Sequence, residues 1–405
     1  MCHLMKLRMV FAGALLVCIT TTAAAQEAAQ DDTRGQYPSF MRDSYFSLNG
    51  GAIGYLFSDT QLEPGFRAES IDKARIAVRI EFFGHHFTKN FSAHVVYMRP
   101  GFFVKYNNVN GHSGSMPVSN AYAGLMLAWN FPLSERLNGY VEGGYGVTSR
   151  SGFEIDGRTA LPTAHYGAGM FGGGVTYPLR ENVDFVLGAT YTPGRQSFNQ
   201  PSTRMYTTGL RYTMHALPAE EVAVNRDGAY FFPTNVVQLG ASTNLLGYGV
   251  NELFGRYVVI FFSGHVEVDH GLTLAYERNV FHSRKRFAFD LGLSASFWDS
   301  NVVHENFVTL SAYPLVRYFL VRAEPADVYF AYSVAGPTFI TQSKLDGLET
   351  GAQFTFQDKM GVGWFMGRSR RVNAELSIKH FSNGNLATSN AGIKIPLTFT
   401  IGLTF

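Results

Sequence analysis

The sequence lacks long apolar runs beyond its first 25 residues, but many of its segments alternate between apolar and polar residues. The longest apolar run, YVVIFF at residues 257–262, is far shorter than the roughly 20 residues of a membrane-spanning helix. The alternating segments are about 9–11 residues long, which is the length of a tilted membrane-spanning strand. In residues 73–82 the apolar face consists of Ala74, Ile76, Val78, Ile80 and Phe82. This period of two predicts β-strands.

Residues 287–298 and 327–336 repeat this alternation with larger apolar side chains. Their apolar faces are Phe287, Phe289, Leu291, Leu293, Ala295 and Phe297 in the first, and Val328, Phe330, Tyr332 and Val334 in the second. A soluble β-sandwich also alternates, so this pattern alone does not separate the two classes. The final segment, residues 397–405, alternates up to Phe405 and resembles the closing strand of bacterial outer-membrane barrels. We therefore expect an all-β, antiparallel transmembrane barrel in the outer membrane of a Gram-negative bacterium.

The sequence indicates the number of barrels less clearly than it indicates the fold class. Residues 205–215 alternate like a second closing strand, with Tyr206, Leu210, Tyr212 and Met214 facing outward. About eight candidate strands lie on each side of the strand-poor residues 216–235, and eight is the smallest usual barrel. Two consecutive units of about eight strands are the simplest interpretation, and one barrel of about sixteen strands is the alternative. The expected division is signal peptide 1–25, leader 26–42, first barrel 43–215, linker 216–235 and second barrel 236–405.

The amino-terminal residues predict export. A basic start, an apolar middle and Ala23–Ala25 are typical of a secretory signal. Both cysteines, Cys2 and Cys18, lie within it, so the mature chain would have no disulfide, thiolate metal site or cysteine nucleophile. The net charge of +2, without basic runs, argues against nucleic acid as a partner. Aromatic residues make up 15% and charged residues 16% of the chain, which suits strands with an aromatic, lipid-facing exterior.

Residues 375–386, ELSIKHFSNGNL, contain the candidate site. Read at period two, Leu376, Ile378, His380 and Ser382 share one face, so an apolar face ends in a histidine and a serine. In a barrel with periplasmic termini the penultimate strand runs outward, which places this pair on the lipid-facing wall near the outer leaflet. Polar side chains there are costly and suggest function, although they also occur at membrane–water interfaces. An imidazole can activate a serine hydroxyl, and amides of the polar loop 383–395 could bind an oxyanion.

The carboxy-terminal half, from about Val236 to Phe405, resembles the lipid A 3-O-deacylase family of small outer-membrane barrels. The resemblance is most specific in residues 347–367, with Phe356, Asp358, Gly361 and Gly363, and in HFSN and NAGI at residues 380–383 and 390–393. It implies that His380 is the base and Ser382 the nucleophile, with Asn383, Asn390 and Gly392 as oxyanion candidates. It also implies a serine esterase that needs no cofactor and acts on lipid A of lipopolysaccharide in the outer leaflet. The histidines other than His85 and His86 are scattered without ligand spacing, so we expect no metal site.

One position departs from the family pattern. Active members place a glutamate fourteen residues after the histidine, and here that position is Lys394. Glu375 lies on the opposite face of its strand, and loop acids such as Glu349 cannot be ranked from sequence. The alternative is an inactive structural or ligand-binding barrel, porin-like, that keeps a relic of the motif. A carboxylate within hydrogen-bonding reach of His380 would favour the enzyme.

The amino-terminal half has no equivalent of the His-x-Ser-Asn motif and resembles a generic small outer-membrane barrel. Its charged strand residues Lys73, Arg75, Arg79 and Glu81 predict a solvated lumen, and Val109–Ser119 is its longest polar loop. The adjacent His85 and His86 would point to opposite faces and make a poor metal pair. The glycine-rich residues 167–175 predict a tightly curved strand. Support, binding and anchoring all remain open as roles, and the oligomeric state is unknown.

Overall fold

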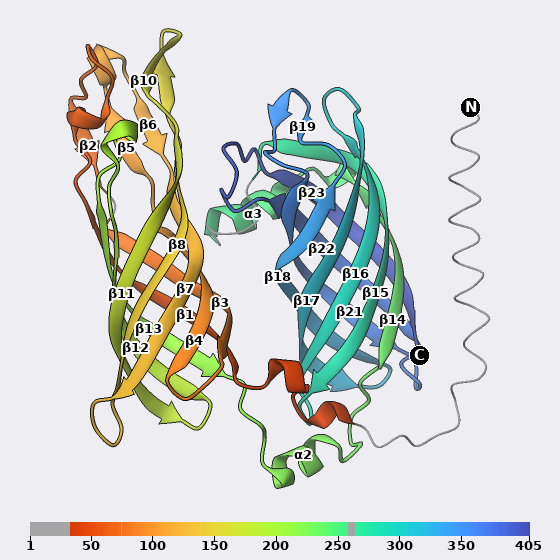
Figure 1. Cartoon of the computed structure of the whole chain (residues 1–405). Coiled ribbons are helices and arrows are strands. Elements are labelled where there is room, and N and C mark those ends of the chain that lie inside the picture. Colours follow the sequence, from red (N-terminus) through yellow and green to blue (C-terminus); the bar gives the residue numbers. More distant parts are fainter. Residues whose placement is uncertain (1–32, 74, 258–263) are drawn as a thin grey trace.

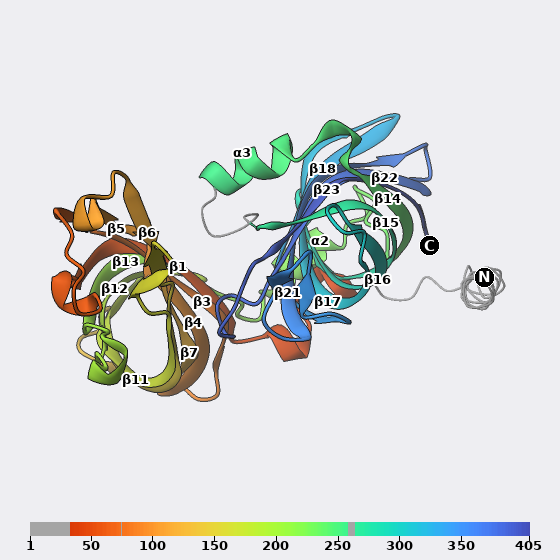
Figure 2. The same ribbon diagram turned by 90° about the horizontal axis from the view of Figure 1, so that it is seen from above.

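The computed structural model describes residues 33–73, 75–257 and 264–405, so the predicted signal peptide and most of the YVVIFF run lie outside the described residues. It contains two closed antiparallel β-barrels of eight strands each (Figure 1). Seen from above, they are two separate rings (Figure 2).

The first barrel is built from β1 (Ser44–Tyr55), β3 (Ile76–His86), β4 (Phe91–Pro100), β7 (Asn120–Pro132), β8 (Asn138–Arg150), β11 (Ala164–Arg180), β12 (Val183–Thr192) and β13 (Thr203–Thr213). The second is built from β14 (Asn235–Thr243), β15 (Val266–His282), β16 (Phe287–Ser300), β17 (Asn306–Ala323), β18 (Ala326–Ile340), β21 (Phe354–Met366), β22 (Val372–Ser382) and β23 (Ile393–Thr404). The glycine-rich residues 167–175 fall inside β11, as the sequence predicted.

Each barrel closes on itself. β13 pairs with β1 from Tyr45↔Thr213 to Tyr55↔Thr203, and β23 pairs with β14 from Val236↔Thr404 to Ser242↔Thr398. Closure pairs the backbone groups that an open sheet edge would leave exposed to lipid. The prediction of two barrel units is confirmed, and the alternative of one sixteen-stranded barrel is wrong.

The carboxyl ends of the two closing strands, β13 and β23, lie at the same end of the molecule as the connection between the barrels. The connection holds α2 (Ala219–Asn225), and the 3-10 turns η1 (Thr33–Gly35) and η2 (Ser39–Met41) precede β1 there. Tyr37 bridges the barrels, because its hydroxyl bonds to the Tyr212 hydroxyl at 2.7 Å and its ring centroid lies 4.3 Å from that of Phe281. This end is periplasmic if the termini are, as in other small outer-membrane barrels.

The longer loops between strands lie at the opposite, outer end. The helical elements of these loops are the 3-10 turns η3 (Asp59–Gln61), η4 (Val109–Gly111), η5 (Gln196–Phe198) and η6 (Asn244–Leu246), and the helix α3 (Gly249–Tyr257). The loops also form three small sheets. The first consists of β2 (Ser70–Asp72), β5 (Val104–Asn107) and β6 (Ser115–Val118), the second of β9 (Phe153–Ile155) and β10 (Arg158–Leu161), and the third of β19 (Lys344–Leu345) and β20 (Leu348–Glu349). The segment expected as a polar loop, Val109–Ser119, holds η4 and β6, because β6 pairs with β5.

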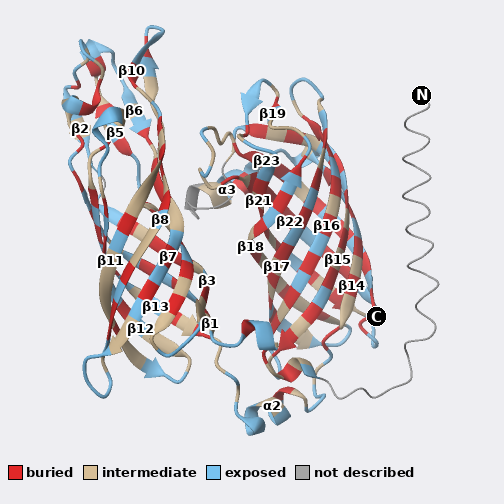
Figure 3. Ribbon diagram, in the orientation of Figure 1, coloured by how far each residue is buried: buried red, intermediate tan, exposed pale blue. Residues whose placement is uncertain are grey.

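Exposed and buried residues alternate along the barrel strands (Figure 3). On β23, Phe399, Ile401 and Leu403 are exposed, whereas Thr398 and Thr400 are buried in the lumen. Among residues 33–73, 75–257 and 264–405, no helix has the length and apolar character needed to cross a bilayer. An apolar exterior around a closed barrel is the arrangement that lipid requires, and the chain is an outer-membrane β-barrel protein of a Gram-negative bacterium.

The lumen of the second barrel is filled with side chains. Apolar clusters occupy its two ends, around Trp298 at the outer end and Phe319 at the periplasmic end. Between them lie three buried carboxylates and three buried cations, namely Glu277, Asp290, Glu375, Arg317, Lys359 and Lys379. This filling contradicts the open lumen expected of a porin.

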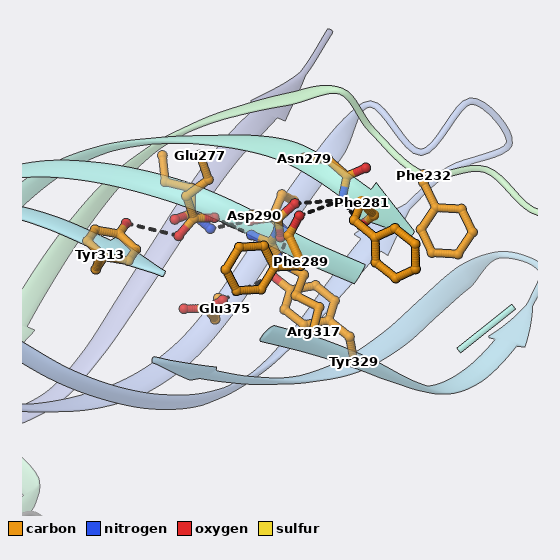
Figure 4. Close-up of polar contacts among 12 residues, drawn as sticks. Phe232, Glu277, Asn279, Phe281, Phe289, Asp290, Tyr313, Arg317, Tyr329 and Glu375 are labelled. Carbon is orange, nitrogen blue, oxygen red and sulfur yellow. Dashed lines mark hydrogen bonds and ion pairs between the residues drawn. The ribbon is translucent and has the colours of Figure 1, made fainter. Parts of the chain in front are cut away.

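Five of these six buried charges are joined in ion pairs (Figure 4), whereas Lys379 Nζ donates a hydrogen bond to Thr273 Oγ1 at 3.3 Å. Arg317 bonds to both Glu277 and Asp290. Lys359 Nζ lies 2.7 Å from a Glu375 oxygen and 3.1 Å from a Glu277 oxygen. Buried charges are costly unless they are paired in this way, so the network fixes the side chains that fill the barrel.

The first barrel has a smaller network with the same charge balance. Arg79 Nη2 donates to Glu142 at 2.8 Å, Arg211 Nη2 donates to Glu81 at 3.0 Å, and Arg79 also bonds to Glu81. Of the charged residues expected to line a solvated lumen, Arg79 and Glu81 do face the interior, but they are 1% and 0% exposed. Lys73 and Arg75 are exposed, because they precede β3 at the outer end.

We predict that Arg317→Met destabilises the second barrel by about 3 kcal/mol, because it leaves two buried carboxylates without their shared cation. Urea titration of the refolded protein, followed by the mobility of the folded form on a gel, measures this. Arg278→Met is the matched control, because Arg278 is exposed on the same strand as Glu277. Equal midpoints for the two variants would contradict the role given to the network.

Candidate active site

Strand register places the charged and polar residues of the motif in one row. β21 pairs with β22 through Asp358↔His380 and Phe356↔Ser382, and β22 pairs with β23 through His380↔Lys394. Residues opposite each other on paired strands share a face, here the outer face, because period two turns the neighbouring side chains into the lumen. Asp358, His380 and Lys394 therefore lie side by side near the outer end of three adjacent strands.

The imidazole of His380 has a carboxylate beside it. Nδ1 of His380 lies 3.5 Å from Oδ2 of Asp358. The other carboxylate oxygen of Asp358 accepts the backbone N–H of Ala335 at 2.8 Å. Ala335 has a φ of +55° where the pairing of β18 with β21 shifts register between Ser333 and Gly336. The irregularity turns a backbone donor toward Asp358 and so fixes the carboxylate next to the imidazole.

The hydroxyl of Ser382 receives two hydrogen bonds. The backbone N–H of Gly384 donates to its Oγ at 3.1 Å, and Nδ2 of Asn390 donates to it at 3.2 Å. Asn390 Nδ2 is also bound to Oδ1 of Asn385 at 3.0 Å, which orients the amide. Two N–H donors thus converge on the oxygen that the sequence predicts to be the nucleophile.

Asn383 holds the loop and is 2% exposed. Its Nδ2 donates to the carbonyls of Thr350 at 2.9 Å and Ser389 at 2.7 Å. Gly351, at φ +107°, permits this contact, because a Cβ there would lie 2.3 Å from the Asn383 amide nitrogen. The side chain of Asn383 is therefore engaged away from Ser382.

Gly392 serves the turn into β23. It has a φ of +64°, and its carbonyl accepts the backbone N–H of Val266 at 3.1 Å. Of the three predicted oxyanion candidates, Asn390 is the one whose side chain donates to Ser382, and Gly384 supplies the second donor.

Lys394 occupies the position at which the family has its acid, but its side chain is paired with Glu267. Its Nζ lies 2.8 Å from Oε1 of Glu267, which stands opposite it where β15 runs parallel to β23. Of the other acids considered from sequence, Glu375 is buried in the lumen, and Glu349 forms a 3.9 Å ion pair with Lys344. The row across the wall is therefore acid, imidazole, cation, acid.

His380 is more enclosed than a lipid-facing position predicts. It is 3% exposed and Ile378 on the same face is 2% exposed, whereas Leu376 farther down the strand is 38% exposed. The outer part of this wall is thus enclosed, and the first barrel stands next to the second (Figures 1 and 2).

Two groups of side chains among the described residues could hold a metal by proximity, since their ligand atoms lie within 4.8 Å of one another. Glu81, His94 and Glu142 are already neutralised by arginines, which a cation would have to displace. Asp269, Asp299 and His304 lie at the outer end of the second barrel, where a hydrogen bond with Asp299 raises the pKa of His304. Neither group includes a residue of the His380 row.

One protein family matches the second half of the chain. Residues 265–400 match the family model of lipid A 3-O-deacylase (PagL). The second barrel is therefore lipid A 3-O-deacylase-like, and the matched segment includes the whole row from Glu267 to Lys394. The search of curated proteins found no match.

Several solved structures have similar folds. The outer membrane enzyme PagL is 14% identical, with 42% of this chain and 99% of that chain covered and a TM-score of 0.31. The amino-terminal barrel domain of Pseudomonas aeruginosa OprF is 14% identical, with 42% and 97% covered and a TM-score of 0.27. Neisserial surface protein A is 15% identical, with 42% and 97% covered and a TM-score of 0.29.

Two contacts of the site in the PagL-like barrel are not evident from sequence alone. Asp358 was noted as part of a motif, but its pairing with His380 follows only from the register between β21 and β22. Gly384 was not singled out, although it follows Ser382 in an Asn/Gly-rich turn, where backbone N–H groups commonly point inward. The ion pair of Lys394 joins residues 127 positions apart, and no local pattern indicates it.

We predict that Asn383→Ala loosens the loop 383–392, because it removes two hydrogen bonds between the loop and its support. A loss of roughly 1–3 kcal/mol raises the open population of the loop by about tenfold or more. Chymotrypsin cleavage after Leu386, timed by mass spectrometry, reports this opening. Thr388→Ala, an exposed change in the same loop, is the control. Equal cleavage rates for both variants would show that Asn383 does not anchor the loop.

Proposed function

We propose that the second barrel is an outer-membrane serine esterase that removes an ester-linked 3-hydroxyacyl chain from lipid A of lipopolysaccharide. The observation that carries the proposal is the carboxylate of Asp358 beside the imidazole of His380, with Ser382 two residues farther along the same strand face. The family match over residues 265–400 supports lipid A as the substrate. Catalytic hydrogen bonds are often long before substrate binds, so 3.5 Å is compatible with this role.

The reaction proceeds in two halves. Ser382 Oγ attacks the ester carbonyl carbon while His380 takes the hydroxyl proton, and the resulting tetrahedral intermediate expels the sugar alkoxide. His380 returns the proton to that alkoxide, which leaves as the deacylated lipid. Water then attacks the carbonyl carbon of the acyl-serine while His380 takes a proton from it. The second tetrahedral intermediate expels the Ser382 oxygen, which regains that proton from His380, and 3-hydroxy fatty acid is released.

The oxyanion is held by the two donors that already converge on Ser382. The N–H of Gly384 and the amide of Asn390 approach Oγ from the loop, so a carbonyl carbon bonded to Oγ would bring its oxygen close to them. Preorganised donors of this kind are worth several kcal/mol in acyl transfer.

Asp358 replaces the family acid as the positioning residue. The family places its acid on the last strand, where this chain has Lys394 engaged with Glu267. Asp358 lies on β21, on the other side of β22 from Lys394. Its carboxylate can hold the imidazole ring and stabilise the imidazolium that forms during attack. The cation at position 394 then needs no part in the chemistry.

We predict that Asp358→Asn lowers the deacylation rate by at least about 100-fold, because it leaves the imidazole without its orienting carboxylate. Ser382→Ala abolishes the reaction, and Lys394→Met keeps the rate within about threefold because Lys394 takes no part in the chemistry. Mass spectrometry of lipid A from cells expressing each variant, with quantified folded protein in the outer membrane, measures the loss of one 3-hydroxyacyl mass.

Asp358→Glu serves as the matched control, because it keeps the charge and should recover part of the rate and the pH profile of the native protein. If Asp358→Asn deacylates as fast as the native protein while Lys394→Met does not, Asp358 is not the orienting acid. Intact lipid A in cells with folded native protein would overturn the esterase itself.

A further inference from the structure

The first barrel reaches the catalytic wall at two places. Tyr97, on the outer face of β4, interacts electrostatically with Asp358 of β21. His165, on β11, interacts with the backbone of Leu386 in the loop that follows Ser382. Figures 1 and 2 show the two barrels standing next to each other. The first barrel thus stands beside both parts of the site, the acid–imidazole pair and the oxyanion loop.

A pocket opens on the first barrel at the outer end of β4, just above Tyr97 in the strand. It has a volume of about 440 Å³ and is lined by Lys73, Arg99, Lys105, Asp72, Phe102 and Phe103. Three cations face one carboxylate, so the lining has an excess of two positive charges. The carboxylate is itself engaged, because Nδ2 of Asn107 donates to Asp72 at 3.0 Å.

The pocket, at the outer end of the first barrel, combines cations with aromatic rings. The guanidinium of Arg99 lies 5.3 Å from the ring centroid of Phe103, which is 40% exposed, and Phe102 is 63% exposed. Aromatic rings favour the membrane–water interface, and lysine and arginine bind phosphate there. A phosphorylated lipid headgroup satisfies both features, with its phosphate on the cations and its sugar or glycerol over the rings.

Arg99 connects this pocket to the proposed catalytic residues. Arg99 and Tyr97 are two residues apart on β4, so their side chains lie on the same outer face of the strand. Tyr97 in turn interacts electrostatically with Asp358. Asp358 lies 3.5 Å from His380. One lipid molecule could therefore have its headgroup in the first barrel and its ester at Ser382 of the second.

We propose that the pocket of Lys73, Arg99 and Lys105 binds a phosphate group of the substrate lipid and that the first barrel is thus the headgroup-recognition half of the enzyme. This deepens the proposed function, on which it rests for the identity of the substrate. It gives the first barrel a role that its own sequence does not reveal, and it explains why its wall stands against His380.

The test uses the full-length chain in lipid nanodiscs and the double variant Lys73→Ala/Lys105→Ala. Binding is measured in the Ser382→Ala background with labelled lipid A carrying its phosphates, and again with lipid A from which the phosphates have been removed. The matched control is Lys89→Ala/Lys285→Ala, two lysines in turns at the periplasmic end. We expect the pocket variant to bind phosphorylated lipid at least about tenfold more weakly, with no change for dephosphorylated lipid and no effect of the control.

Competition with inorganic phosphate separates the two sources of the anion. Binding of inorganic phosphate to the native chain, together with lipid binding that does not depend on the lipid phosphates, would show a free-anion site and overturn the assignment to a headgroup. Equal binding of both lipids by the native chain, or unchanged binding by the pocket variant, would also overturn it. The rate of deacylation is measured separately with Ser382 present. If binding depends on the lipid phosphates but no deacylation occurs, the proposed esterase activity is wrong, whereas the proposed phosphate-binding pocket stands.

Discussion

The register of three adjacent strands determines the chemistry available to this protein. In a closed barrel surrounded by lipid, each strand must pair its backbone groups with both neighbours, so a strand cannot slide without breaking many hydrogen bonds at once. That constraint puts Asp358, His380 and Lys394 in one row and Ser382 at the end of the same face. A shift of one residue on β22 would turn the imidazole into the lumen and separate it from Asp358.

The buried charges of the lumen support that register from inside. Glu375 lies on the inner face of β22, and Lys359 lies on the inner face of β21, so their ion pair ties together the two strands that carry His380 and Asp358. The same alternation that faces the catalytic pair outward therefore directs its stabilising charges inward. Structural and proposed catalytic residues are neighbours in sequence and stand on opposite sides of one wall.

Most of the fold could be predicted from sequence because lipid demands a pattern that is visible locally. The alternation at residues 397–405 and 205–215 marked two closing strands, and closure of each barrel is the pairing observed. The filled interior could not be predicted in the same way, because the pairing of Glu277 with Arg317 and Lys359 joins strands far apart in sequence.

The candidate site was only partly accessible to sequence reasoning for the same reason. His380 and Ser382 belong to one local motif, whereas Asp358 becomes the partner of His380 through cross-strand pairing, and Glu267 joins Lys394 through a parallel contact. The low exposure of His380 could not be predicted from sequence. A period of two separates lumen-facing from outward-facing residues, but it does not show which part of the protein lies next to the outer face. Contacts of Tyr97 and His165 with the second barrel come from the tertiary arrangement alone.

The central claim is that Ser382 is a nucleophile activated by His380 and oriented by Asp358. Its most direct test is labelling of the folded protein with a lipid-soluble organophosphonate that reacts with activated serines, followed by peptide mass mapping. The account predicts one adduct, on Ser382, which is lost in His380→Ala and forms far more slowly in Asp358→Asn. Deacylation of lipid A without any adduct on Ser382, or labelling that does not depend on His380, would contradict it.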